Sequence, residues 1–584
     1  MRLIKKISFL FLILALLGGI FYLGDYVTKL RYSNKKVLNS LEEQSKTQNL
    51  QGISSLSEEL GRVKEGLTQT KGELEKFINL IPRLKEDVKL KETLTAIIDN
   101  LDCLDNLTFI LDGLNQKEDS LICLKNLYNS FKDLEKLNVS FGKNYQQDIS
   151  TILDFLGDSQ KKNYLVLLQY PFISRPTGGL FASYGILSID KGKINFSGNH
   201  ISDLDNIFVS KIIPPEPLQA ISNQWFFHDL GWFYDFDFTA KKIIQFYEEN
   251  TQDKIDGVIL INPETIANIM EVVGEIKLED YSLAITANNF SEFLKEQLET
   301  GFKPGPSRLS PLILDDFFTL IFEKLKTQDP EKITNLIDNF QSQILEKDIQ
   351  FYFKDEKFNQ YFSRYLEKET NQTDYSNFLA VTFSLIDKEL KTDTRLKKII
   401  LKTEITEEGK FINQLIVNAE ARTSADRKNL DYLKIYLPEG VEILKVEGLT
   451  KVNKEDNSKY YEKLNYAKDS DLNLIEQSKI IMEEENAEIY KENGKLVIGG
   501  FAYLSKTPVN LDYVLPFSLQ KENLPQLVET NIYRQSGQSV NFLYKIILPS
   551  ELRLSPTLFS FEKWIPLDKD LNIKVNIEKN EPNF

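Results

Sequence analysis

The sequence predicts an α+β multidomain chain with an N-terminal transmembrane helix, a helical stalk and hairpin, a central α/β domain and a C-terminal antiparallel β-sandwich. Three observations carry this prediction. Residues 7–23 bear no charge, residues 163–280 alternate strand-like and helix-like apolar patterns, and apolar residues follow a period of two from about residue 397. We expect the four segments to cover residues 1–28, 29–160, 161–378 and 379–584.

The first segment has the features of a signal anchor. The cationic flank Arg2, Lys5 and Lys6 precedes an apolar run of seventeen residues, from 7 to 23, which as a helix spans roughly 26 Å. A cleaved signal peptide is the alternative, but its cleavage site needs small residues, and this run ends in Phe21-Tyr22-Leu23. Because the cationic flank stays inside, we expect a single-pass protein of the cytoplasmic membrane with its bulk extracytoplasmic.

The composition narrows the function classes. A net charge of −15 argues against nucleic-acid binding, which needs a basic face. The two cysteines and two histidines, Cys103, Cys123, His200 and His228, do not have the spacing of a zinc site. The part after the anchor is long enough for several domains with their own apolar cores.

The second segment is predicted to be helical. In residues 30–82 apolar side chains recur at alternating steps of four and three, which indicates a membrane-proximal stalk whose seam could also join copies into a homo-oligomer. A helical hairpin turning near Gly113 would bring Cys103 and Cys123 side by side, and outside the membrane a disulfide could form. The alternative is two buried free cysteines.

The central segment alternates strands and helices. Continuous apolar runs at 164–168 and 258–261 predict strands covered on both faces, and residues 181–189 are a further strand candidate. Residues 241–249 and the segment opened by Pro263 predict helices. This order indicates an α/β layer structure.

The loop after the first strand is one candidate site. Gly178 and Gly179 allow close backbone approach to an anion, Thr177 adds a hydroxyl, and Arg175 supplies a forked cation for phosphate or carboxylate. The alternative is a tight turn between two strands in which Arg175 forms a structural salt bridge.

Acidic and aromatic residues form a second candidate site. Asp203 and Asp205 follow the strands, while Asp229 and Asp235 flank Trp232. Carboxylates among aromatic rings suit sugar binding or a hard cation such as Mg²⁺. The alternative is that the rings are core and the acids cap helices, with Asp237 as an N-cap.

The last segment is predicted to be a β-sandwich, a module that usually binds a ligand or acts as a spacer between domains. Asn493-Gly494 is a hairpin signal, and Leu-Pro ends several strands. The predicted strands are 399–405, 412–419, 432–437, 495–503, 509–515, 542–548 and 571–577.

Residues 163–280 resemble the bacterial domain-of-unknown-function family 4012, whose members carry an N-terminal membrane anchor. The stretches that carry the resemblance are Tyr164–Gln169, Arg175–Gly185, Pro214–Leu218, Asp229 with Trp232, Asp235 and Phe236, and Phe246-Tyr247 through Asp256–Ile259.

That family is in turn distantly similar to the LytR–CpsA–Psr phosphotransferases, which attach glycopolymers to peptidoglycan. This similarity implies that Arg175 holds a pyrophosphate, that Asp203 or Asp205 holds Mg²⁺, and that Asp229 and Asp235 line the acceptor site. The chain departs from these patterns, with His228 in place of a usual Arg and Gly231 in place of a usual Asn. The predicted site has therefore lost cations.

Two functions follow. One is an envelope protein that binds glycan or a partner through its α/β domain. The other is a Mg-dependent phosphotransferase acting on a polyprenyl-pyrophosphate-linked donor. The enzyme requires Arg175, Asp205, Asp229 and Asp235 to line one cleft.

Overall fold

A computed structural model describes residues 92, 93, 96, 119–136, 143–207, 211–301, 312–325, 327–328, 330–366, 376–388, 392–452, 457–555 and 560–580. The predicted anchor, the predicted seam of the stalk and Cys103 lie outside these residues. Within them, none of the helices has the length and apolar character needed to span a bilayer.

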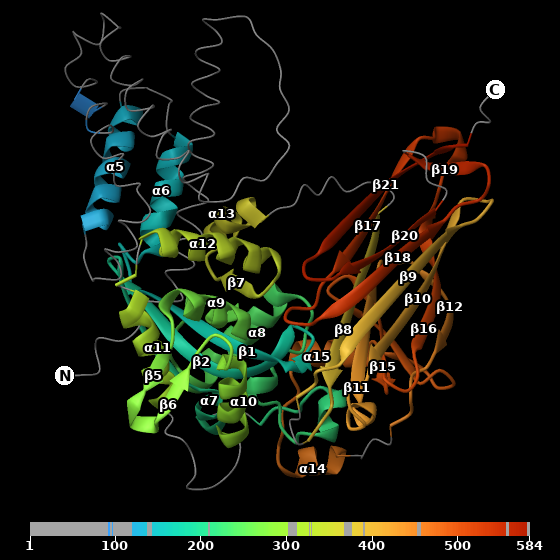
Figure 1. The fold of residues 1–584 in the computed structure, drawn as a ribbon, viewed down its shortest axis with the longest axis horizontal. Helices are drawn as coiled ribbons and strands as arrows, with labels where there is room; N and C mark the ends of the chain where they lie inside the picture. Colours follow the sequence, from blue (N-terminus) through green and yellow to red (C-terminus); the bar gives the residue numbers. More distant parts are fainter. Residues whose placement is uncertain are drawn as a thin grey trace, which may run out of the picture.

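The N-terminal half of the described chain is built on one mixed sheet (Figure 1). Its central strand pairs antiparallel with one neighbour and parallel with the other. Even-numbered side chains of that strand, such as Tyr164 and Val166, enter one apolar core, and odd-numbered ones, such as Leu165 and Leu167, enter another. The predicted strand covered on both faces is therefore confirmed. In spatial order the strands are β3 (Lys193–His200), β2 (Gly178–Asp190), β1 (Lys162–Arg175), β4 (Gly257–Ile261) and β7 (Ile349–Phe353).

Helices cover both faces of this sheet. The face with the larger core also carries the small hairpin of β5 (Ile276–Leu278) and β6 (Leu283–Ile285). The other face is covered by α7 (Ile201–Ile207) and α8 (Phe236–Thr251). Helices of the larger core are α5 (Asp119–Lys136), α6 (Lys143–Phe155), α9 (Pro263–Val273), α10 (Phe290–Gly301), α11 (Leu312–Leu325), α12 (Pro330–Leu345) and α13 (Glu356–Leu366).

Helices α5 and α6 belong to this core, although the sequence places residues 29–160 in a stalk and hairpin. Leu124 and Leu127 of α5 and Ile149 and Leu153 of α6 are buried in the larger core. The two helices also contact each other. The α/β unit therefore begins earlier in the chain than residue 161.

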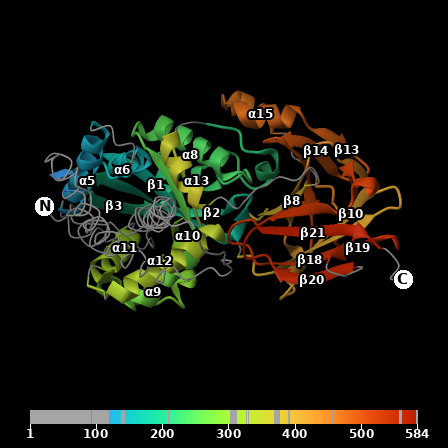
Figure 2. The same cartoon turned by 90° about the horizontal axis from the view of Figure 1, so that it is seen from above.

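The C-terminal half is a sandwich of two sheets that share one apolar core (Figures 1 and 2). The strand pairs are mostly antiparallel, but two strands from the start of this half pair parallel with strands from its end. The prediction of an antiparallel sandwich does not hold for these two strand pairs. The first sheet has the order β12 (Glu442–Glu447), β16 (Val509–Ser518), β10 (Lys410–Glu420), β9 (Leu396–Ile405), β18 (Val540–Ile547) and β20 (Ser560–Pro566).

The second sheet faces the α/β half along one side. Its strand β8 contacts β1 directly. The Asn493-Gly494 turn is confirmed, since both residues have positive φ, 48° and 68°. In order the strands are β13 (Ile480–Met482), β14 (Ala487–Glu492), β15 (Lys495–Ala502), β11 (Asp431–Leu437), β8 (Ser376–Leu385), β17 (Gln526–Tyr533), β21 (Leu571–Lys579) and β19 (Leu552–Ser555).

The two halves are joined by the loop Arg534–Gln538, between β17 and β18, which we call the docking loop. Gln535 Nε2 donates to the carbonyl of Arg175 at 2.6 Å, and Gln538 Nε2 donates to the carbonyl of Pro171 at 2.7 Å. Both glutamines are buried. Since buried amides need partners, the docking loop is held by backbone carbonyls of β1.

We expect Gly537→Ala to destabilise the protein by about 1–3 kcal/mol. Gly537 has φ +66°, and a Cβ there would lie 2.3 Å from Pro171 Cγ. Gly494 also has positive φ but has nothing within 4 Å of an added Cβ, so Gly494→Ala is the matched control for backbone strain alone. If Gly537→Ala and Gly494→Ala lost equal amounts of unfolding free energy in urea titrations, the result would contradict a specific close approach between Gly537 and Pro171.

Candidate functional site

Arg175 lies at the end of β1 and is fully buried. Its Nε donates to Asp229 Oδ1 at 2.7 Å. Its Nη1 donates to the carbonyls of Ser174 and of Leu385, at 2.8 and 2.9 Å. Arg175 is thus held by the α/β half and by β8 of the sandwich, and the turn with a structural salt bridge is the arrangement observed.

The ion pair continues into a chain of alternating charges. His228 Nε2 lies 3.3 Å from Asp229 Oδ2, and His228 Nδ1 lies 2.6 Å from Asp205 Oδ2. Burial alone would lower the pKa of His228, but the two carboxylates raise it to about 10. Burial likewise opposes ionisation of Asp229, yet Arg175 and His228 hold its pKa well below the usual range. His228 is therefore a cation at neutral pH. It carries the same charge as the arginine that is usual at this position in the family that the sequence resembles.

Thr177 and the two glycines serve packing. The Thr177 hydroxyl donates to the carbonyl of Phe233 at 2.7 Å. The Gly179 N–H donates to Gln169 Oε1 at 3.1 Å, and a Cβ on Gly179 would lie 2.4 Å from the Tyr170 carbonyl. These N–H and hydroxyl groups are directed at the protein, where the anion-binding hypothesis needs them open to a ligand.

Trp232 is covered by the sandwich. Its ring stacks on Tyr432 of β11 at a centroid distance of 6.0 Å. The Lys434 ammonium lies 4.9 Å from the Trp232 ring centroid and donates to the Trp232 carbonyl at 3.0 Å. Glu492 pairs with Lys434 at 2.9 Å. Trp232 is therefore an anchor between the two halves and offers no open face to a sugar.

Asp205, one of the two acids predicted as metal ligands, is held by protein donors. Asp205 accepts from the His228 ring and from the backbone N–H of Phe227 at 2.8 Å, so both of its oxygens face protein donors. Asp203 is half-buried and lies near Tyr184. Burial of Tyr184, together with the negative charge of Asp203, raises the pKa of the Tyr184 hydroxyl to about 12. Within the described ranges no three His, Cys, Asp or Glu side chains are grouped as a metal site.

The remaining predicted residues lie apart from this chain of charges. Asp235 is exposed and is the N-cap of α8, since its Oδ1 accepts the Phe238 N–H at 2.8 Å. The prediction of Asp237 as that cap is wrong by two residues. Cys123 lies on α5, and because Cys103 is outside the described residues their disulfide stays a prediction. The structure thus brings Arg175, Asp229 and Asp205 together in an enclosed network, not along an open cleft.

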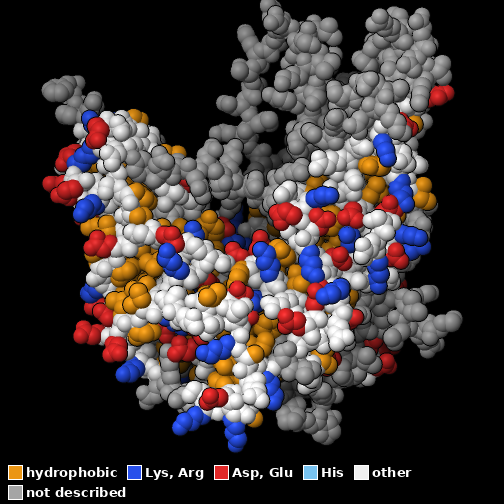
Figure 3. Space-filling model, turned by 180° about the vertical axis from the view of Figure 1, so that it is seen from behind, with side chains coloured by type: hydrophobic (Ala, Val, Ile, Leu, Met, Phe, Trp, Pro, Cys, Tyr) orange, Lys and Arg blue, Asp and Glu red, His pale blue; other side chains and the backbone are white. Residues whose placement is uncertain are grey.

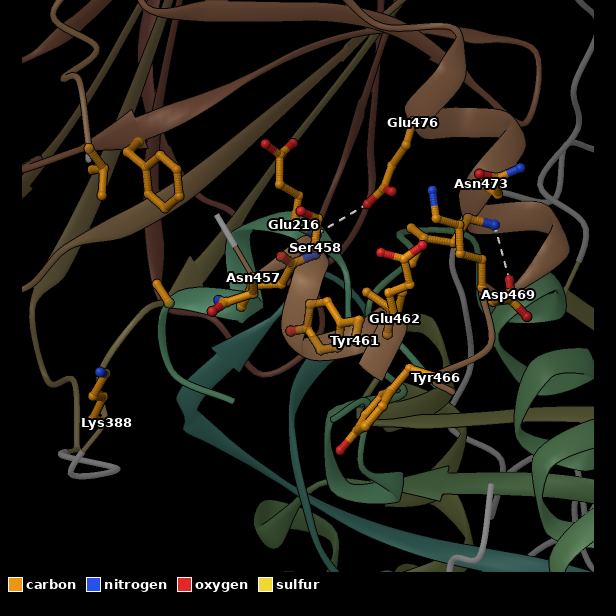
Figure 4. Close-up of a pocket in the computed structure, with 17 residues that line it drawn as sticks. Glu216, Lys388, Asn457, Ser458, Tyr461, Glu462, Tyr466, Asp469, Asn473 and Glu476 are labelled. Carbon is orange, nitrogen blue, oxygen red and sulfur yellow. Dashed lines mark hydrogen bonds between the residues drawn. The ribbon is translucent and has the colours of Figure 1, made fainter. Parts of the chain in front are cut away.

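An open pocket of about 970 Å³ lies instead where the two halves meet (Figure 4). Its volume is typical of small-ligand sites. One wall comes from residues 213–220 of the α/β half, and the others come from the sandwich half, mainly its helices α14 (Ser458–Lys463) and α15 (Ser470–Gln477). The lining residues are Ile213, Glu216, Gln219, Ala220, Lys388, Val452, Asn457, Ser458, Tyr461, Glu462, Tyr466, Lys468, Asp469, Leu472, Asn473, Glu476 and Phe501.

Backbone hydrogen bonds hold these walls together. Ile213 N–H donates to the Ala467 carbonyl at 2.9 Å, and Ala467 N–H donates to the Lys211 carbonyl at 2.7 Å. The Glu216 N–H donates to Glu476 Oε1 at 3.1 Å. Because both halves contribute to each bond, the pocket is formed by their docking.

Tyrosine and amide side chains line the pocket beside its charged groups. Tyr461 and Tyr466 are in ring contact at 5.2 Å, and Tyr466 is partly exposed. Asn457 and Asn473 also line the cavity. Rings beside amide and carboxylate groups can contact the apolar faces and the hydroxyls of a saccharide.

Sequence reasoning missed this pocket. The segment 457–479 has no strand period and only short helices, so it reads as a connection between strands. The signal that could have found it is the run Tyr460-Tyr461 followed by Tyr466, three aromatic residues in a polar stretch.

The fold and the pocket define a protein in which a mixed α/β unit and a two-sheet sandwich dock and form an open, polar pocket between them. Residues 159–298 match the model of the family described as "Protein of unknown function (DUF4012)", which supports for this segment the resemblance stated from the sequence. No curated protein matches the chain.

The crystal structure of the transcriptional regulator yvhJ from Bacillus subtilis is similar to 37% of this chain and 84% of its own, at 9% identity. The TM-score of 0.19 is too low for this likeness to carry an argument about fold or function.

Proposed function

We propose that the chain is a membrane-anchored, extracytoplasmic envelope protein that binds a saccharide in the pocket between its two halves, without catalysis. The location rests on the charge-free run 7–23 after a cationic flank. The single observation that supports saccharide binding is the open cavity lined by Tyr466, Tyr461 and several amide and carboxylate groups.

The phosphotransferase alternative gains less support. It needs a guanidinium that can reach a pyrophosphate, and a carboxylate free to hold Mg²⁺. Arg175 is buried against Asp229 and two carbonyls, and Asp205 is bound to His228. If the fold is related to the LytR–CpsA–Psr enzymes, the residues at the position of their active site form a structural ion-pair network in this chain.

The charge distribution is consistent with a polar, non-nucleic-acid ligand. Figure 3 shows lysine, arginine and acidic side chains interspersed over the face it draws, without an extended basic surface. A net charge of −15 disfavours anionic polymers as ligands.

The test is calorimetric titration of the full chain in detergent with a soluble digest of peptidoglycan. We expect Tyr466→Ala to weaken binding roughly tenfold, because one aromatic contact contributes about 1 kcal/mol or more. Tyr503→Ala, at a partly buried tyrosine outside the pocket, is the matched control and should bind like the parent. Absence of binding by the parent protein would exclude the proposed function.

A further inference from the structure

The charged groups of the pocket fall into two sets. Four carboxylates and two ammonium groups line it: Glu216, Glu462, Asp469, Glu476, Lys388 and Lys468. Two of the carboxylates are neutralised by the protein itself. Glu216 pairs with Lys479 at 3.0 Å, and Asp469 pairs with Lys242 at 2.6 Å.

The other four charges are directed to the cavity. In the described part of the chain, neither Lys388, Lys468 nor Glu462 has an ion-pair or hydrogen-bond partner for its side chain. Within the described residues the Glu476 carboxylate accepts the Glu216 N–H, and burial raises the pKa of Glu476, an effect that Lys479 and, more weakly, Lys468 oppose. Two ammonium groups and two carboxylates therefore remain to meet a ligand.

These charges are separated in space. Figure 4 shows Lys388 on the far side of the cavity from α15, which carries Glu476, while Glu462 projects from α14 between them. Lys388 follows β8, so its wall belongs to the β8–β9 connection. The cavity thus has a cationic end at Lys388, and two carboxylates, Glu462 and Glu476, on the side away from it, where Lys468 opposes Glu476 in part.

We infer that the pocket selects a saccharide carrying both a free carboxylate and a free amino group, such as a disaccharide with a short peptide ending in a diamino acid. This inference rests on the proposed function and deepens it. The carboxylate of such a ligand meets Lys388, and its ammonium meets Glu462 and Glu476. Charge-assisted hydrogen bonds of this kind are about twice as strong as neutral ones. A purely anionic polymer would leave Glu462 without a cation, and a neutral glycan would give neither Lys388 nor Glu462 an opposite charge.

The test compares three probes by calorimetry against the full chain in detergent. The first is the disaccharide of N-acetylglucosamine and N-acetylmuramic acid bearing L-Ala-D-Glu-L-Lys. The second is the same molecule with the lysine amine acetylated, and the third is the disaccharide without peptide. We expect the first probe to bind at least tenfold more tightly than either of the others.

Two neutral variants locate the effect. Lys388→Met and Glu462→Gln should each reduce binding of the first probe about tenfold, and Glu462→Gln should leave the acetylated probe unaffected. Lys459→Met and Glu483→Gln, at exposed charges outside the pocket, are the matched controls and should bind like the parent. Because Lys388 and Glu462 are exposed, thermal melts should be unchanged in all four.

The outcomes separate the two proposals. Equal binding of all three probes would overturn the selection for a zwitterionic ligand while leaving saccharide binding intact. Failure of every probe to bind would overturn both. Tighter binding of the first probe that survives Lys388→Met and Glu462→Gln would place its site outside this pocket and overturn the inference.

Discussion

Arg175→Met should lower the free energy of unfolding by about 3–5 kcal/mol, because it leaves a buried carboxylate without its principal partner. Asp229 would keep only His228 as a counter-charge, and the carbonyl of Leu385 would lose its donor. The measurement is urea denaturation of the full chain, followed by tryptophan fluorescence. Trp225 and Trp232 both lie in the affected region.

A double-mutant cycle separates this interpretation from a catalytic one. Arg175→Met combined with Asp229→Leu should cost less than the sum of the two single changes, because the double variant buries no unpaired charge. Lys388→Met is the control at an exposed cation and should leave stability unchanged. A stable Arg175→Met protein that had lost a phosphotransfer activity would contradict the structural role and restore the enzyme hypothesis.

The stability of the protein should fall by a few kcal/mol as the pH rises from about 6.5 to 10, through deprotonation of His228. Its pKa is raised to about 10 in the folded state, against 6.5 when exposed. A group whose pKa is higher in the folded than in the unfolded state stabilises the fold fully at pH values below its unfolded-state pKa. This stabilisation is lost as the pH rises through the folded-state pKa. Each pKa unit corresponds to about 1.4 kcal/mol. Asp229, whose pKa is lowered, acts at the opposite end: its contribution is present above the ordinary carboxyl pKa and is lost in strong acid.

Since the chain has only two histidines, the titration can be observed directly. In a His200→Gln background, the imidazole resonances of His228 should not titrate between pH 5 and 8. Urea denaturation at pH 6, 8 and 10 should show a decline that is absent in His228→Gln. A His228 ring that titrates near pH 6.5 would show that the chain of charges from Arg175 to Asp205 is not formed.

The sequence predicted most of the strands, because each depends on a local pattern. Continuous apolar runs located β1 and β4, and the strand candidate at residues 181–189 is part of β2. Each predicted strand of the sandwich is present as β9, β10, β11, β15, β16, β18 or β21. Strands such as β8 and β17 were missed, since buried polar residues interrupt their apolar pattern, Thr382 and Ser384 in β8 and Glu529 in β17.

The candidate site could be predicted only in part. The loop at Arg175 was found, but both an anion site and a structural salt bridge fitted its residues. The choice between them depends on Asp229, 54 positions away, and on Leu385, 210 positions away. No local pattern encodes such contacts. The pocket has the same origin, because its walls come from segments that only the docking of the two halves brings together.

The docking loop has a consequence for how this chain can be divided. Gln535 and Gln538 find their acceptors on the carbonyls of Arg175 and Pro171, in the other half of the molecule. If either half were produced alone, these amides or carbonyls would face water. The apolar surface around Trp232 and Tyr432 would then be exposed to solvent. Each half would then tend to aggregate. The two halves are therefore distinct in structure but are not expected to fold independently. They should be expressed and purified as one chain.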